Sequence, residues 1–264
     1  MLPQKQTVNC KSAASMESMF KTWTGNRLTF NSRLGLALIL VFGIPRFLVV
    51  LQASQTGNYG LTSIIFILMI MLPYVLLTKQ GRHETGMVKP GHWGWLFYGL
   101  LAGVILSLLV GFAGQLLYNQ NPQNWYVYIS RSYTLPEFSP DGPAKFHFFL
   151  IFAVIGMTFS PFGEELLYRG IIHQSFKRRF SDQGASVIDS AAFSITHLAH
   201  FGFIYVDGSW SFTVIPSLLW MFFMFVAGRL FFVIRQKSGS VLGAIATHAG
   251  FNLGMTWYIF YVLL

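Results

Sequence analysis

Residues 147–176 read HFFLIFAVIGMTFSPFGEELLYRGIIHQSF, an apolar segment with charged side chains in its second half. The segment exceeds the roughly 20 residues that a helix needs to cross a bilayer. Glu164, Glu165 and Arg169 lie inside it, where lipid makes each ionised group costly by about 3 kcal/mol or more. Such groups usually serve a function in membrane proteins, so this segment predicts both a membrane-spanning helix and a site.

The composition extends this prediction to the whole chain. Of its 264 residues, 53% are hydrophobic and only 10% are charged, whereas soluble domains devote about a quarter of their residues to charged side chains. Apolar stretches long enough to span a bilayer recur along the chain. Their approximate bounds are 35–53, 60–78, 93–118, 147–176, 185–206, 211–234 and 240–263. We therefore expect an all-α integral membrane protein, a polytopic bundle of about seven transmembrane helices.

The net charge of +9 is explained by the predicted membrane topology and does not indicate a nucleic-acid site. Lysine and arginine concentrate in the N-terminal tail and in segments 79–89, 177–179 and 235–237, and they are sparse in the loops between. By the positive-inside rule, this alternation predicts an N-terminus inside and a C-terminus outside. We expect a polar cytoplasmic tail over residues 1–34, a transmembrane domain over 35–264, the lipid bilayer as surroundings and no nucleic-acid partner.

The longest predicted loop covers residues 119–146. Its aromatic residues include Trp125, Tyr126, Tyr128 and Tyr133, which are typical of the headgroup level of a membrane. We therefore expect this loop to lie on the outer surface of the bilayer.

Helical geometry assigns different roles to the two adjacent glutamates. Neighbouring residues on a helix point about 100° apart, so Glu164 and Glu165 cannot face the same small site. Glu165 and Arg169 have the i, i+4 spacing of a helical ion pair. This pairing leaves Glu164 free on the adjacent face, where a carboxylate without a cationic partner can serve as a general base.

Two later apolar segments carry His197 and the pair His248 and Asn252. His248 and Asn252 are also four residues apart, so they share a helix face and offer two hydrogen-bond donors to one point, as an oxyanion hole requires. At about 1.5 Å per residue, Glu164, His197 and Asn252 lie roughly 18–20 Å from the inner boundary, with His248 one turn lower. These similar depths allow the side chains to meet in one layer of the bundle if the helices adjoin, which the sequence alone does not show.

These motifs together resemble a known family. The pattern EExxxR at 164–169, FxxxH at 193–197 and HxxxN at 248–252 is similar to that of the CPBP intramembrane proteases. This family joins the CAAX prenyl endopeptidases to bacterial Abi-type and bacteriocin-processing enzymes. The resemblance covers residues 147–260, which we expect to form the catalytic core.

The resemblance implies an intramembrane endopeptidase with assigned catalytic residues. Glu164 and His197 would activate a water molecule, and His248 and Asn252 would stabilise the oxyanion. Glu165 and Arg169 would form a supporting ion pair. The resemblance further implies a membrane-associated peptide, or a prenylated or leader-bearing protein, as substrate. It favours the bacterial plasma membrane as location, or the endoplasmic reticulum in a eukaryote.

The same residues also allow other functional hypotheses. Glu164, His197 and His248 could instead hold zinc as a three-ligand hydrolytic site. The sequence has no HExxH motif, and the resemblance favours a mechanism without a metal cofactor. A non-proteolytic membrane immunity or regulatory binding protein would use the polar cluster for recognition. A channel or transporter would use it as a proton relay, but the paired inverted segments of transporters are not evident.

Overall fold

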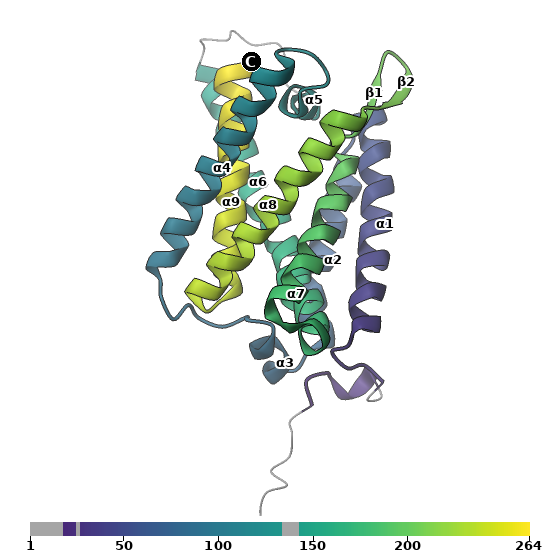
Figure 1. Cartoon of the computed structure of the whole chain (residues 1–264), viewed down its shortest axis with the longest axis vertical. Coiled ribbons are helices and arrows are strands. Elements are labelled where there is room, and N and C mark those ends of the chain that lie inside the picture. The colour runs from purple at the N-terminus through teal and green to yellow at the C-terminus, as the bar shows by residue number, and fades with distance from the viewer. Residues whose placement is uncertain (1–17, 25–26, 134–142) are drawn as a thin grey trace, which may run out of the picture.

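The computed structural model describes residues 18–24, 27–133 and 143–264, which form a bundle of long helices with one small β-hairpin (Figure 1). The elements in chain order are η1 (Thr22–Thr24), α1 (Ser32–Thr56), α2 (Gly60–Leu76), α3 (Lys79–Glu84), α4 (Gly94–Tyr118), α5 (Trp125–Ser130), α6 (Pro143–Glu165), η2 (Leu166–Ile172), α7 (His173–Thr196), η3 (His197–Ala199), β1 (Phe203–Val206), β2 (Ser209–Phe212), α8 (Val214–Ser238), α9 (Val241–Tyr258) and η4 (Ile259–Leu263). Residues 1–17 of the predicted tail lie outside the described residues.

The described helices have the length and the surface of membrane spans. Four helical stretches are long and apolar enough to cross a membrane: Ser32–Thr56, Gly94–Tyr118, Pro143–Ala199 and Val214–Ser238. Large hydrophobic side chains face outward from them, for example Leu116, which is 73% exposed. Glu164 and Arg169 are instead fully buried. This arrangement reverses that of a soluble protein, and the chain is a multi-pass, all-α membrane protein. The count of seven spans stays a prediction.

The basic segments lie at one end of the bundle, here called the basic end. In Figure 1, α3, the turn within α7, the end of α8 and the start of α1 all lie towards the bottom of the bundle. The C-terminus, α5 and the hairpin lie at the opposite end. The helices thus alternate in direction, as the distribution of basic residues predicts. That the basic end faces the cytoplasm stays a prediction.

A helical hairpin brings two of the sequence motifs together. The chain runs through α6 and η2 into the first part of α7 and reverses at Phe180 and Ser181, where Ser181 has a φ of 60°. The remainder of α7 then runs back towards the opposite end of the bundle, packs against η2, α1 and α8, and ends at Thr196. As a result, the helix that carries Glu164 and the helix that leads to His197 are the two arms of one hairpin.

The predicted span 185–206 is wrong in its last part. The helix gives way to η3 and a turn, and β1 then pairs antiparallel with β2. The reason is a strong local hairpin signal, Asp207-Gly208, in which both residues have positive φ, at 50° and 77°. The following span therefore begins at Val214 rather than at 211.

The predicted position of the loop aromatics is also wrong for three of its residues. Trp125, Tyr126 and Tyr128 are buried in the bundle rather than placed among lipid headgroups. Trp125 donates its indole N–H to the Val110 carbonyl at 3.1 Å, and the Tyr126 hydroxyl lies 2.7 Å from Ser107 Oγ. These aromatic side chains close the end of the bundle because each finds a polar partner for its N–H or O–H.

Close packing against α4 fixes the position of α9, which carries His248 and Asn252. A Cβ atom at Gly103 of α4 would overlap the Thr247 carbonyl oxygen, and one at Gly250 of α9 would overlap the Leu100 carbonyl oxygen. Small residues commonly allow such close backbone approach between membrane helices. The reciprocal contact therefore holds α9 at one height against α4.

Candidate active site

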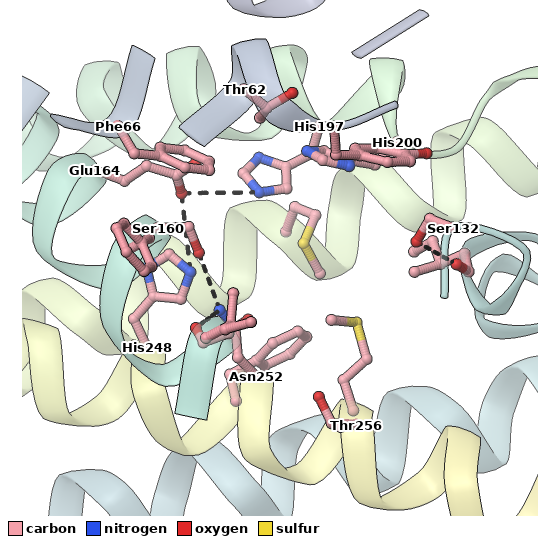
Figure 2. Close-up of a pocket in the computed structure, with 18 of the residues that line it drawn as sticks. Thr62, Phe66, Ser132, Ser160, Glu164, His197, His200, His248, Asn252 and Thr256 are labelled. Atoms are coloured by element: carbon pink, nitrogen blue, oxygen red, sulfur yellow. Dashed lines mark hydrogen bonds and ion pairs between the residues drawn. The ribbon is translucent and has the colours of Figure 1, made fainter. Parts of the chain in front are cut away.

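Four of the predicted site residues line one cavity of about 280 Å³. Glu164 comes from the end of α6, His197 from the first residue of η3, and His248 and Asn252 from α9. Figure 2 shows the four side chains around the same space. The structure thus brings together residues that lie up to 88 positions apart, since Glu164 precedes Asn252 by that number in the chain.

Glu164 is the side chain that both histidines approach. Its Oε2 lies 4.0 Å from His197 Nε2 and 3.8 Å from His248 Nε2, contacts that Figure 2 draws as dashed lines. Both separations exceed the length of a direct hydrogen bond. Glu164 is fully buried.

The FxxxH motif orients the His197 ring. His197 Nδ1 lies 2.7 Å from the Phe193 carbonyl oxygen, and the two rings are 4.1 Å apart between centroids. Because a carbonyl oxygen only accepts, Nδ1 carries the hydrogen in this contact, and the neutral ring keeps a lone pair on Nε2. That lone pair faces Glu164. Trp220 Nε1 also donates to the His197 carbonyl oxygen at 3.0 Å, which fixes the backbone of η3.

His248 stands between the two glutamates. Its Nδ1 lies 2.9 Å from Glu165 Oε1, while its Nε2 points towards Glu164. The ring stacks on Phe231 of α8, with centroids 4.8 Å apart and planes 14° from parallel. The carboxylate and the stacked ring together hold the imidazole in one orientation.

Glu165 and Arg169 make the contact that their spacing predicts, with Arg169 Nη1 3.1 Å from Glu165 Oε1. Glu165 and Arg169 make this i, i+4 contact although η2, a π-helical turn, begins at Leu166. Both side chains are fully buried and lie behind the residues that line the cavity. The same Glu165 oxygen contacts His248, so the ion pair is directly joined to the site.

Asn252 already uses its amide hydrogens in this structure. Its Nδ2 donates to the Gly156 carbonyl oxygen at 2.8 Å and to Ser160 Oγ at 3.1 Å. Both acceptors lie on α6, so Asn252 links α9 to the helix that carries Glu164. The Gly156 carbonyl also fixes which amide atom is nitrogen, because only a donor can bond to it.

Glu164 has a cationic partner, which corrects the prediction that it is unpaired. The guanidinium of Arg46, on α1, contacts the Glu164 carboxylate. Arg46 Nη1 also donates to Thr196 Oγ1 at 3.0 Å, and Nη2 lies 3.2 Å from His200 Nε2. Helix spacing within one segment could not reveal this pair, because its members come from different helices.

Three residues of the cavity were missed as site residues: Arg46, Ser160 and His200. Arg46 did carry a signal, since it is a charged residue inside an apolar stretch. His200 lies three residues after His197, a spacing that places both on one side of a helical turn. Ser160 carried no comparable signal, because serine is common in membrane helices.

The rest of the cavity wall is mainly apolar. Its apolar side chains include Phe66, Ile155, Phe159, Met224 and Phe251. Lipid-soluble chains and hydrophobic peptide side chains suit such a wall, while His197 and His248 lie next to Glu164.

Among the described residues, no group of three or more His, Cys, Asp or Glu side chains is arranged to hold a metal ion. The alternative zinc ligands, Glu164, His197 and His248, do converge, but the Oε2 to Nε2 separations of 4.0 and 3.8 Å exceed the roughly 3.4 Å between neighbouring ligands of a tetrahedral zinc site. In this conformation the three side chains do not fit zinc closely.

Comparison with known proteins gives one finding. Residues 146–254 match the family model described as type II CAAX prenyl endopeptidase Rce1-like. The comparisons with curated proteins and with solved structures found no match. The matched segment runs from α6 into α9 and includes all three motifs. This family match supports the interpretation that the chain is a CAAX-type intramembrane protease, which acts on a peptide or protein in the membrane. The match over residues 146–254 thus supports the CPBP family of intramembrane proteases.

Proposed function

We propose that this chain is an intramembrane endopeptidase that uses Glu164 as its general base. The observation that carries the proposal is the position of Glu164 Oε2, 4.0 Å from His197 Nε2 and 3.8 Å from His248 Nε2, in a cavity with mainly apolar walls. A carboxylate and an imidazole at this separation can hold one water molecule between them, with about 2.8 Å to each.

Glu164 and His197 would activate that water. With Nδ1 directed at the Phe193 carbonyl, His197 presents the Nε2 lone pair, and the Glu164 carboxylate also accepts. A water that donates to both keeps its own lone pairs free for the scissile carbonyl. Glu164 takes the proton as the carbon–oxygen bond forms, and it then gives this proton to the amine nitrogen as the carbon–nitrogen bond breaks, which releases an amine and a carboxyl group.

His248 and Asn252 would stabilise the oxyanion that forms on the carbonyl oxygen. Because His248 Nδ1 faces Glu165, which as a carboxylate only accepts, Nε2 can donate only when the ring carries both protons. Asn252 would exchange its 3.1 Å bond to Ser160 Oγ for one to the oxyanion, and it would keep the bond to Gly156.

The apolar cavity supports a substrate that lies in the membrane. We propose a membrane-associated peptide or a prenylated or leader-bearing protein, cleaved without a metal cofactor. The Abi-like motifs support the bacterial plasma membrane as the location, with the endoplasmic reticulum as the eukaryotic counterpart.

A comparison of cellular peptides tests the proposal. Cells that lack the protein are complemented with the wild type or with Glu164→Gln at matched expression, and membrane-associated peptides are identified by mass spectrometry. We expect cleavage products with the wild type only. Glu84→Gln, the same change on α3 and outside the cavity, serves as control. Unchanged products and phenotype with Glu164→Gln would favour the non-enzymatic immunity or regulatory role.

A further inference from the structure

A chain of buried polar side chains extends from the candidate active site towards the basic end. At its centre is Asp189, which is fully buried on the returning arm of the helical hairpin. Its Oδ1 lies 3.5 Å from Arg169 Nε, and its Oδ2 lies 2.8 Å from His173 Nδ1. Arg169 and His173 are also fully buried, and both precede the turn at Phe180 and Ser181.

Asp189 therefore ties together the two arms of the hairpin. One arm leads from Glu164 to Arg169 and His173, and the other leads from Asp189 to His197. The separation of Glu164 from His197 depends on how these arms are aligned. Two contacts from one carboxylate, to two different turns of the opposite arm, oppose sliding of the arms along each other.

The same network reaches α9 through Glu165. Glu165 Oε1 is contacted both by Arg169 Nη1, at 3.1 Å, and by His248 Nδ1, at 2.9 Å. Both donors can bind this one oxygen at the same time, because a carboxylate oxygen has two lone pairs. The carboxylate of Asp189, with Oδ1 3.5 Å from Arg169 Nε, adds a second ionic contact that holds the guanidinium where Glu165 can bind both Arg169 and His248.

Helix α8 restricts the position of the Arg169 side chain. A Cβ atom at Gly228 would overlap Arg169 Nη2, so the absence of a side chain at this position admits the guanidinium. Phe231, one turn further along α8, lies 5.3 Å from the Arg169 guanidinium and stacks on the His248 ring. The position of Arg169 is thus set by Asp189 on one side and by α8 on the other.

Asp189 and His173 do not line the cavity. Asp189 precedes His197 by eight residues, which corresponds to about 12 Å along a helix. Neither side chain can therefore contact a peptide bond held at Glu164, and any effect on the reaction must pass through other residues.

We propose that Asp189 and His173 are positioning residues of the active site, which hold Arg169 and through it keep Glu165 hydrogen-bonded to His248. The catalytic part of this proposal rests on the proposed peptidase function. An asparagine at position 189 offers one acceptor in place of the two carboxylate oxygens. Arg169 then depends on Glu165 alone, and His248 loses its fixed orientation.

Kinetics with purified full-length protein in lipid nanodiscs test the catalytic part. For Asp189→Asn we expect kcat to fall on the order of 10²-fold with KM unchanged, the loss typical of small misplacements at a reacting centre. Asp207→Asn, the same change in the distant β-hairpin, should leave kcat unchanged. His173→Asn keeps an N–H donor near Asp189 and should retain more activity than His173→Leu. All assays are run at temperatures where circular dichroism shows each variant folded.

Nitrogen-15 NMR of ring-labelled histidines gives a readout that does not need activity. The His248 signals are assigned by their loss in His248→Asn. We expect Asp189→Asn to shift them and Asp207→Asn to leave them in place. Gly228→Ala, which displaces Arg169 without changing any charge, should shift the same signals. This variant provides a second test if Asp189→Asn does not fold.

The two measurements separate the possible failures. Unchanged His248 signals in both Asp189→Asn and Gly228→Ala overturn the proposal, whatever happens to kcat. So does a lower melting temperature with normal kcat in the folded variants, which would make the network merely structural. If the wild type cleaves no peptide, the proposed function fails, while shifted His248 signals would still support the positioning network.

Discussion

Arg46 on α1 contacts the carboxylate of Glu164 at the end of α6, and both side chains are buried. The same guanidinium reaches Thr196, at the end of the returning arm of the hairpin, and His200 just beyond it. Arg46 lies outside the segment 146–254 that matches the protease family. An ionised carboxylate is costly to bury without a partner, so the N-terminal helix supplies a charge that the matched segment needs.

We predict that Arg46→Gln destabilises the folded protein by about 3–5 kcal/mol, because it leaves a buried carboxylate without its cation. Arg46→Lys should recover only part of this loss, since an ammonium lacks the fork that reaches Glu164, Thr196 and His200 together. Denaturant unfolding in detergent measures both effects. The double variant Arg46→Gln/Glu164→Gln should lose less than the sum of the single losses, and strictly additive losses would contradict the pair.

Cleavage should distinguish the two adjacent glutamates. Glu164→Gln should abolish cleavage, because an amide cannot take the proton of the attacking water. The Arg46→Gln/Glu164→Gln protein should be inactive as well, although it should lose less stability than the sum of the two single losses. Glu165→Gln weakens the contacts to Arg169 and His248 but leaves the base in place, so some turnover should remain. A peptide cleavage assay in nanodiscs would contradict this assignment if only Glu165→Gln were inactive.

The sequence predicted the parts of this molecule that depend on local periodicity. Hydropathy located the helices, and the i, i+4 spacing of Glu165 and Arg169 is matched by a 3.1 Å contact. The order of the three motifs also pointed to one cavity. These features could be predicted because each is a property of one helix, or of the depth of a residue measured from the same end of the bundle.

Contacts between distant helices could not be predicted in this way. The pairing of Arg46 with Glu164 depends on how α1 packs, which no spacing within 147–176 encodes. Likewise, the bonds from Asn252 to Gly156 and Ser160 depend on the packing of α6 against α9. Trp125 shows the same limit, because an aromatic residue in a loop can face lipid headgroups or fill the end of a bundle.

Metal dependence gives a separate prediction. We expect purified, active protein to contain less than stoichiometric zinc and to keep its cleavage rate after chelator treatment, with Glu164 acting as base rather than as ligand. Elemental analysis and the peptide assay measure the two quantities. One zinc per chain that is lost in His197→Ala, together with activity restored by added zinc, would instead assign Glu164, His197 and His248 as ligands.

His197 should be nearly indispensable for cleavage. In the proposed mechanism it is the second acceptor for the attacking water, and its ring is held by Phe193 so that Nε2 faces Glu164. His197→Ala removes that acceptor and should reduce kcat to the background. Phe193→Leu keeps the backbone carbonyl but removes the ring packed against His197, so its loss should be partial. Equal losses for Phe193→Leu and His197→Ala would argue against the orientation inferred for the ring.

Asn252 and His248 should act on the transition state rather than on substrate binding. Loss of one oxyanion donor typically costs about 10²–10³ in rate, so Asn252→Ala should lower kcat by that factor and leave KM nearly unchanged. Ser160→Ala removes only the acceptor that Asn252 must release and should have a much smaller effect. His248→Ala should cost more than Asn252→Ala, because the imidazole also stands between both glutamates. The nanodisc assay decides between the roles: a large rise in KM with unchanged kcat in Asn252→Ala would make Asn252 a substrate-binding residue.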